Sequence, residues 1–175
     1  MRCKHCKEQF EPVKFLQKYC FKSECVKVWV ETENAKQWTK KKSQMKADLT
    51  TTSDYLKLTQ QVFNKFIRMR DEGLNCISCN KPIKQGNVDA GHLWSSGGHS
   101  NIRFNELNVN SQCSRPCNKD KSGDINNYRL GFVKKYGLEK LEELDLIAKI
   151  EKKWDKEELQ LLIKEYKQKI KELNK

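Results

Sequence analysis

Residues 112–123 read QCSRPCNKDKSG and place Cys113 and Cys117 within one short turn. Two cysteines separated by two to four residues can present both sulfurs to one tetrahedral zinc ion. Asn118 follows the second cysteine directly, and amide oxygens are hard ligands of the kind that Mg²⁺ or Mn²⁺ prefers. The stretch therefore predicts half of a structural zinc site and offers Asn118 as a residue for chemistry beside it.

The other six cysteines extend this pattern along the chain. All eight fall in close pairs, with two, four, two and three residues between the members of successive pairs. Because the N-terminus carries no apolar signal segment, we expect an intracellular protein whose paired thiols bind metal rather than form disulfides. Two structural zinc sites are predicted, one formed by Cys3, Cys6, Cys20 and Cys25 and the other by Cys76, Cys79, Cys113 and Cys117.

The charge balance indicates a polyanionic partner. The 175 residues include 35 Lys and Arg against 23 Asp and Glu, for a formal net charge of +12. Nucleic acid is the first partner that this excess suggests and an anionic membrane surface the second, while a solvated basic surface is the alternative. No apolar run reaches the roughly 18 residues that a transmembrane helix needs, so we expect a soluble protein.

The patterns along the chain predict a mainly helical α+β protein. Residues 26–46 read as a long polar helix, and apolar residues at helical spacing across 55–67 predict a second helix with a core face. VDAGHL reads as a short strand and LNVNSQC as a turn or second strand, with a helix from Asn118 onward. The predicted domains are an N-terminal zinc ribbon at 1–26, a basic helical linker at 27–53, a zinc-stapled core at 54–130 and a helical region at 131–175.

The last helix is predicted from its start signal and its periodicity. Asp155 precedes Glu158 by three positions, which is a capping-box arrangement, and apolar residues then recur on one helical face. This face either packs on the body of the protein or forms the seam of a dimer.

Three residues of the central region share a spacing known from nucleases. His92 ends the predicted strand, Asn108 lies five residues before Cys113, and Asn118 follows Cys117. This spacing resembles the HNH nuclease motif, a ββα-metal fold built around a treble-clef zinc site. The resemblance implies that His92 is the general base, that Asn108 fixes the hairpin loop and orients the base, and that Asn118 binds a catalytic Mg²⁺ or Mn²⁺. A neutral imidazole suits the role of base near pH 7.

One position departs from the HNH pattern. HNH proteins commonly carry an acidic metal ligand directly before the histidine, and this chain has Gly91 there. Because side chains alternate faces along a strand, Asp89 points the same way as position 91. Asp89 is therefore the candidate metal-binding carboxylate, with Glu106 as the second choice. The remaining histidines are not predicted ligands: we expect His5 to be exposed, and His99 to be exposed or to contact phosphate.

Longer segments extend the resemblance over essentially the whole chain. The N-terminal zinc ribbon, DAGH, IRFNELN, QCSRPCNKDKSG and the tail ending in EYKQKIKEL resemble the NinG (Rap) family of lambdoid phage recombination proteins. This resemblance implies a phage- or prophage-encoded, structure-specific endonuclease that acts in the bacterial cytoplasm. Its implied substrates are branched DNA intermediates, Holliday junctions and D-loops, rather than a small molecule.

The resemblance also shapes what we expect of DNA binding and assembly. Symmetric resolution of a four-way junction needs two opposed cuts, so we expect a homodimer formed through the helix at 26–46 or through the last helix. The alternatives are a non-catalytic, zinc-stapled junction-binding module, which Gly91 favours, and a protein-interaction adaptor that uses the C-terminal helices. The basic residues expected to guide the DNA backbone are Lys40, Lys41, Lys42, Arg68, Arg70, Arg103, Lys119 and Lys121.

Overall fold

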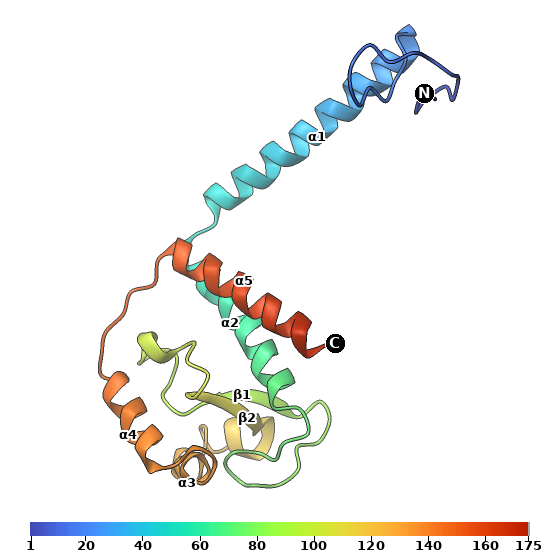
Figure 1. The fold of residues 1–175 in the computed structure, drawn as a ribbon. Coiled ribbons are helices and arrows are strands. Elements are labelled where there is room, and N and C mark those ends of the chain that lie inside the picture. Colours follow the sequence, from blue (N-terminus) through green and yellow to red (C-terminus); the bar gives the residue numbers. More distant parts are fainter. Residues whose placement is uncertain (175) are drawn as a thin grey trace. The chain divides into compact units, whose positions relative to one another are not determined.

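A computed structural model describes residues 1–174 of the protein, apart from the side chains of residues 46 and 47. The chain divides into two compact units, Met1–Thr50 and Thr51–Lys175, which we call the N-terminal and C-terminal units (Figure 1). Helices dominate both, and the sheet in the described part of the chain is one two-stranded antiparallel hairpin. None of the described helices is long and apolar enough to cross a membrane.

The N-terminal unit consists of a turn-rich loop followed by α1 (Ser23–Leu49). An isolated antiparallel bridge between Arg2 and Gln9 folds the start of the loop back on itself. The core of the unit is small, because its buried apolar side chains are cysteines with Phe10 and Tyr19 packed beside them. The helix predicted at 26–46 is confirmed, and it extends by three residues at each end.

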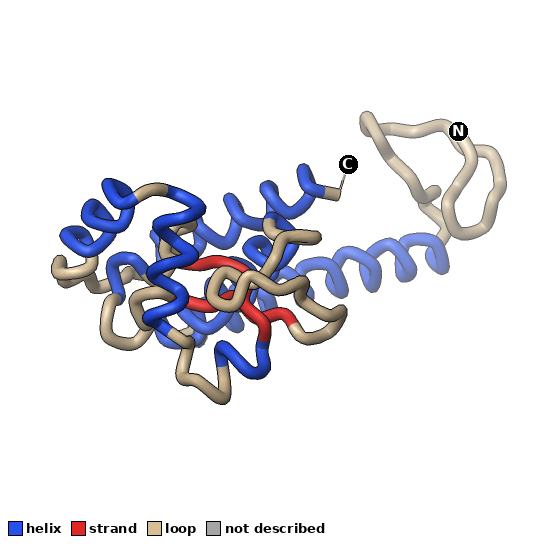
Figure 2. The backbone as a smooth tube through the Cα atoms, turned by 90° about the horizontal axis from the view of Figure 1, so that it is seen from below, coloured by secondary structure: helices blue, strands red, loops and turns tan. Residues whose placement is uncertain are grey.

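The C-terminal unit is built around the hairpin of β1 (Val88–His92) and β2 (Val109–Cys113), the two red strands of Figure 2. The register pairs Val88 with Cys113 and His92 with Val109. The outer edge of β2 is covered by the chain that follows α2, because the N–H of Ile77 donates to the carbonyl of Ser111. All five residues of β2 are therefore buried.

Two helices pack together beside the hairpin. These are α2 (Thr52–Arg70) and α5 (Lys156–Leu173), and both begin with a capping box, at Thr51 and at Asp155. Their shared core contains Phe63 and Ile67 of α2, Leu159 and Tyr166 of α5, and Val109 of β2. The apolar face of α5 therefore packs on the body of the protein, which is one of the two predicted alternatives.

A second apolar cluster joins α3 (Ile125–Tyr136) and α4 (Leu138–Ile147) to the other side of the hairpin region. Tyr128 and Phe132 of α3 are fully buried in it. Gly131 lets α3 approach the segment after α2, since a Cβ at this position would lie 1.8 Å from the carbonyl oxygen of Ile77. No residue other than glycine fits here without moving the helix.

The segment after β2 corrects one prediction. A short helical turn, η2 (Ser114–Asn118), follows the strand and is interrupted by Arg115 in an extended conformation. Gly123 and Asp124 then adopt positive φ angles, and α3 starts only at Ile125. The prediction of a helix from Asn118 onward is wrong, because left-handed residues end any helical path that starts at Asn118.

Candidate active site and metal centres

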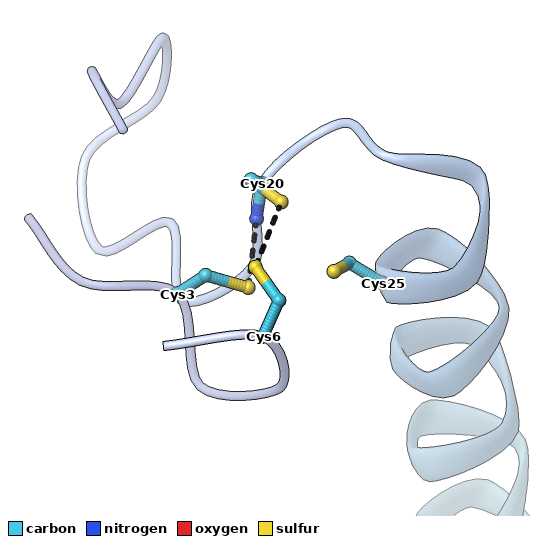
Figure 3. A group of neighbouring side chains, drawn as sticks. All are labelled: Cys3, Cys6, Cys20 and Cys25. Atoms are coloured by element: carbon cyan, nitrogen blue, oxygen red, sulfur yellow. Dashed lines mark hydrogen bonds between the residues drawn. The ribbon is translucent and has the colours of Figure 1, made fainter. Parts of the chain in front are cut away.

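The first cysteine tetrad lies in the N-terminal unit. Cys3, Cys6 and Cys20 come from the loop and Cys25 from the first turn of α1, and their sulfurs all lie within 4.8 Å of one another (Figure 3). The sulfurs of Cys6 and Cys20 are 3.7 Å apart. The backbone N–H of Cys20 donates to the sulfur of Cys3 at 3.3 Å, as backbone amides commonly support thiolate ligands.

The second tetrad lies in the C-terminal unit and joins two separate segments. Cys76 and Cys79 follow α2, Cys113 ends β2, and Cys117 lies in η2, with all four sulfurs within 4.8 Å of one another. The sulfurs of Cys79 and Cys113 are 3.9 Å apart. The N–H of Cys113 donates to the sulfur of Cys76 at 3.4 Å. This tetrad therefore ties the end of the hairpin to the chain after α2.

Both tetrads fit a tetrahedral zinc ion. Zinc–sulfur bonds of about 2.3 Å in a tetrahedron require sulfurs about 3.8 Å apart, which matches the two sulfur–sulfur distances above. Burial raises the pKa of Cys25 to about 12 and also raises the pKa of Cys117. Four adjacent thiols ionise together only when a cation offsets this cost. Each tetrad can thus hold one zinc ion, with four protein ligands and no open position.

Asp89 and Asn118, two of the predicted ligands of a catalytic metal, lie next to each other. The side-chain amide of Asn118 donates to Oδ2 of Asp89 at 2.9 Å. Asp89 comes from β1, which pairs with β2, and Asn118 follows Cys117 at the end of η2. The second tetrad holds η2 against the end of β2, because it contains both Cys113 and Cys117. Both side chains are partly exposed. The pair can present carboxylate and amide oxygens to a hard cation.

Gly91 is explained by a neighbour that the sequence analysis missed. A Cβ at position 91 would lie 2.3 Å from Oε1 and 3.0 Å from Cβ of Gln112. The side chain of Gln112 is fully buried and held in place, because its amide donates to Oγ of Ser78 at 2.7 Å and to the carbonyl of Gly123 at 2.6 Å. An acidic residue at position 91 would have to displace Gln112. The register pairs Gln112 with Asp89, which shares a face of β1 with Gly91, so strand alternation combined with this register is the signal that could have found Gln112.

His92 is held as a neutral imidazole on the other face of β1. Its Nε2–H donates to the carbonyl of Arg103 at 3.3 Å, so Nδ1 carries no proton in the neutral ring, and the backbone of Ala90 also interacts with the ring. Burial lowers the pKa of His92 below that of an ordinary histidine. No hydrogen bond joins His92 to Asp89 or Asn118 among the residues that the structure describes.

Asn108 ties down the loop between the two strands. Its amide donates to the carbonyls of Trp94 at 3.0 Å and Ile102 at 3.1 Å, and its Oδ1 accepts from the N–H of Trp94 at 2.8 Å. The residue is fully buried, and the N–H of Leu93 donates to its carbonyl. This one buried side chain therefore links Trp94 and Ile102 of the loop that follows His92.

The remaining acidic and histidine candidates lie in other environments. Glu106 accepts from Nζ of Lys169 on α5 at 2.7 Å, so this carboxylate is held by an ion pair instead of by Asn118. His5 is exposed, as expected. His99 is half-buried instead of exposed: its ring packs edge-on against Trp94, and Nδ1 lies 2.9 Å from the carbonyl of Ala148. Contact of His99 with phosphate stays a prediction.

The predicted DNA-contacting residues divide into exposed and internal side chains. The guanidinium of Arg70 is internal, because it pairs with the carboxylate of Asp71 and donates to the carbonyls of Glu106 and Val109. Nε of Arg103 donates to Oε1 of Gln60 at 2.8 Å, and Arg68 is partly buried. The exposed members of the set are Lys40, Lys41 and Lys42 on α1, and Lys119 and Lys121 just after Asn118. Nζ of Lys121 lies 3.6 Å from the carboxylate of Asp124.

Comparison with known proteins places the chain in a family. The profile described as "Bacteriophage Lambda NinG protein" matches residues 1–175. Protein ninG of Escherichia phage lambda is 37% identical over 128 residues, 73% of this chain and 61% of that protein, and protein ninG of Salmonella phage P22 is 36% identical over 128 residues, 73% of this chain and 62% of that protein. Protein ninG of Escherichia phage 933W is 31% identical over 189 aligned positions, covering 98% of this chain and 92% of that protein.

The chain thus belongs to the NinG family of lambdoid phage proteins. It spans about three fifths of the length of the lambda and P22 relatives. No solved structure matches it.

Proposed function

We propose that this protein is a metal-dependent endonuclease of the HNH type that cuts branched DNA intermediates of phage recombination. The observation that carries the proposal is the contact between Asn118 and Asp89, made directly beside Cys117 of the second tetrad. A zinc-stapled turn that positions a carboxylate and an amide at the side of a β-hairpin supports a ββα-metal site. The protein would act inside the infected bacterial cell.

Asp89 and Asn118 would hold the catalytic ion. A bound Mg²⁺ or Mn²⁺ would stabilise the charge that develops on the phosphate and on the leaving oxygen. Gln112 blocks the position directly before the histidine, so the carboxylate comes from two residues earlier in β1. Hydrogen bonding to Asn118 already orients the Asp89 carboxylate.

His92 would act as the general base. The carbonyl of Arg103 holds Nε2–H, so Nδ1 is the atom that takes a proton from the attacking water. The lowered pKa keeps the ring neutral near pH 7, which is the state that a base requires. Asn108 would keep the following loop, and with it the ring, in position.

The substrate is chosen by charge and shape. Lys119 and Lys121 are exposed beside Asn118 and would contact phosphates next to the cut. The net charge of +12 favours a polyanion, and a branched junction already has the bent, unstacked geometry that a duplex reaches only by deformation. A homodimer would deliver the two opposed cuts that symmetric resolution needs. Light scattering with and without junction DNA tests this assembly, and a monomeric mass in both would exclude it.

Cleavage of a labelled four-way junction tests the proposal. Wild type should cut the junction and spare a matched linear duplex, only when Mg²⁺ or Mn²⁺ is added. His92→Ala, Asp89→Asn and Asn118→Ala should each cut at least about 100-fold more slowly, because each removes the base or a metal-binding group. The matched control is His5→Ala, which removes an exposed histidine of the other unit and should cut as wild type does.

A second candidate function is a junction-binding module without catalysis. The observation that favours it is that His92 and Asp89 lie on opposite faces of β1, with glycine in place of the usual acid. Titration with Mn²⁺ separates the two functions in protein whose zinc content is complete. The nuclease requires a third, weaker metal site that Asp89→Asn removes, whereas the binding module has none. If the junction DNA stays intact at all protein concentrations with Mg²⁺ or Mn²⁺ present, the nuclease proposal is wrong.

A further inference from the structure

The N-terminal unit contains a groove that the proposed nuclease site does not use. It lies between the loop before Cys20 and the first turns of α1 and has a volume of about 660 Å³. Four of its lining residues are aromatic: Phe15, Tyr19, Phe21 and Trp29. The groove belongs entirely to the Met1–Thr50 unit, so it is separate from the hairpin that carries His92.

The aromatic side chains of this groove are unusually open to solvent. Phe15 is 94% exposed, Phe21 68% and Trp29 48%. Large aromatic side chains gain free energy when another surface covers them, so a contiguous exposed set marks a binding site. The small cysteine-rich core of the unit does not use these rings, because only Phe10 and Tyr19 pack on it among the aromatic residues described.

The same groove is lined by cations. Lys4, Lys14 and Lys18 lie along it, and none of them forms an ion pair with another described residue. The one acid in the lining, Glu33, is paired with Lys36. Over the whole unit, residues 1–50 contain twelve Lys and Arg against six Asp and Glu, which gives a net charge of +6. The ligand must therefore combine flat apolar surfaces with repeated negative charge.

We propose that this groove binds single-stranded DNA. Unpaired bases would stack on Phe15, Phe21 and Trp29, while the lysines would contact the phosphates that connect the bases. Duplex DNA fits poorly, because its bases are already stacked on one another and offer only their edges. The site needs no catalytic metal and lies outside the nuclease site, so it goes beyond the proposed function. It gives the N-terminal unit the role of holding unpaired strands.

Fluorescence anisotropy of the full-length, zinc-loaded protein without Mg²⁺ or Mn²⁺ tests the inference. The probes are an oligo(dT) of about 12 nucleotides, a duplex of the same length, and a single strand of the same length made only of abasic sites. Wild type should bind oligo(dT) at least about 10-fold more tightly than the abasic strand, which has the same phosphates without bases.

The variants at position 15 separate stacking from other contacts. Phe15→Ala and Phe15→Leu should each weaken oligo(dT) binding about 10-fold, and Phe15→Tyr should stay within about 2-fold of wild type. The matched control is Trp38→Ala, which removes an aromatic ring of α1 that is 63% exposed and lies outside the groove. It should bind oligo(dT) as wild type does.

Three outcomes would overturn the inference. Equal binding of oligo(dT) and the abasic strand would show that the protein binds the phosphates alone and that no base stacks on the aromatic rings. Wild-type affinity in Phe15→Leu would indicate an apolar partner in place of stacked bases. A dimer that Phe15→Ala converts to a monomer, without a change in oligo(dT) affinity, would assign the groove to a second copy of the chain. His92→Ala should keep full oligo(dT) binding, so failure of the nuclease proposal and failure of this one are distinguishable.

Discussion

Each unit of the protein carries four cysteines that can bind one zinc ion, but the surroundings of the two tetrads are very different. In the N-terminal unit the tetrad is nearly the whole core, because Phe10 and Tyr19 are the aromatic residues packed on it. In the C-terminal unit the tetrad lies beside two separate apolar clusters, one with α2 and α5 and one with α3 and α4. Identical ligands therefore serve two purposes: they replace a hydrophobic core in one unit, and they position a site on an existing core in the other.

The largest expected difference between the units follows from removing one ligand of each tetrad. Cys3→Ser should abolish protected structure in residues 1–20, because metal binding of about 10–16 kcal/mol supplies nearly all the folding free energy of such a small unit. Cys76→Ser should leave α2 and α5 folded. Zinc analysis and hydrogen exchange measure both effects. Slowly exchanging amides in the N-terminal loop of Cys3→Ser would show that this loop stays folded without its complete zinc site.

A core truncation should act on the C-terminal unit alone. Phe63 is fully buried and packs edge-on against Phe104 and Tyr166. Phe63→Ala should lower the free energy of unfolding of this unit by about 3–5 kcal/mol, because it leaves a cavity between α2 and α5. Urea unfolding measures the loss. The control is Leu161→Ala on the exposed face of α5, which should stay within about 0.5 kcal/mol of wild type.

The close approach of Gly91 and Gln112 predicts a coupled pair in the hairpin. Gly91→Ala should destabilise the C-terminal unit by about 1–3 kcal/mol, because the new Cβ overlaps the Gln112 side chain. In a Gln112→Ala background the same change should have a smaller effect, and a double-mutant cycle measures the difference. Gly97→Ala, where no atom lies within 4 Å of a new Cβ, is the control. If the effects of Gly91→Ala and Gln112→Ala on stability are additive, the new Cβ does not overlap the Gln112 side chain.

The smallest expected effect is the pH dependence that His92 adds to the stability of the C-terminal unit. Burial lowers the pKa of His92 in the folded protein, so below the ordinary value of about 6.5 the unfolded chain binds more protons. Stability should therefore fall as pH drops from about 6.5 through the folded pKa, by at most about 1.4 kcal/mol per pH unit. His92→Gln should flatten this slope, and the exposed control His5→Gln should preserve it. Urea unfolding at several pH values, with zinc content checked, decides between them.

Local signals in the sequence predicted much of this fold. The cysteine spacing identified both tetrads, and the capping box at Asp155 and Glu158 identified the start of α5. The strand of VDAGH was recognisable as β1. Alternation along that strand placed Asp89 on the face of position 91, and the structure brings Asp89 to Asn118. Each of these features depends on residues a few positions apart, where spacing dictates geometry.

Features that depend on contacts between residues far apart in the sequence were not predicted. Arg70 looked like a free surface cation, but it lies against the outer edge of β2, where Asp71 and backbone carbonyls take up its donors. His99 looked like a residue of an open loop, but it packs on Trp94 and meets a carbonyl after α4. Only the folded chain determines which charged and polar groups face each other.

Local sequence signals were enough to predict where metal can bind and where most of the helices and strands form, because ligand spacing, capping and periodicity are properties of neighbouring residues. Long-range contacts in the folded chain set the environment of each side chain. They place Gln112 over Gly91, which excludes an acid before His92, and they pack the apolar face of α5 on α2. They also leave Phe15, Phe21 and Trp29 exposed in a basic groove. These outcomes depend on which surfaces meet when the chain folds, and short stretches of sequence do not carry that information.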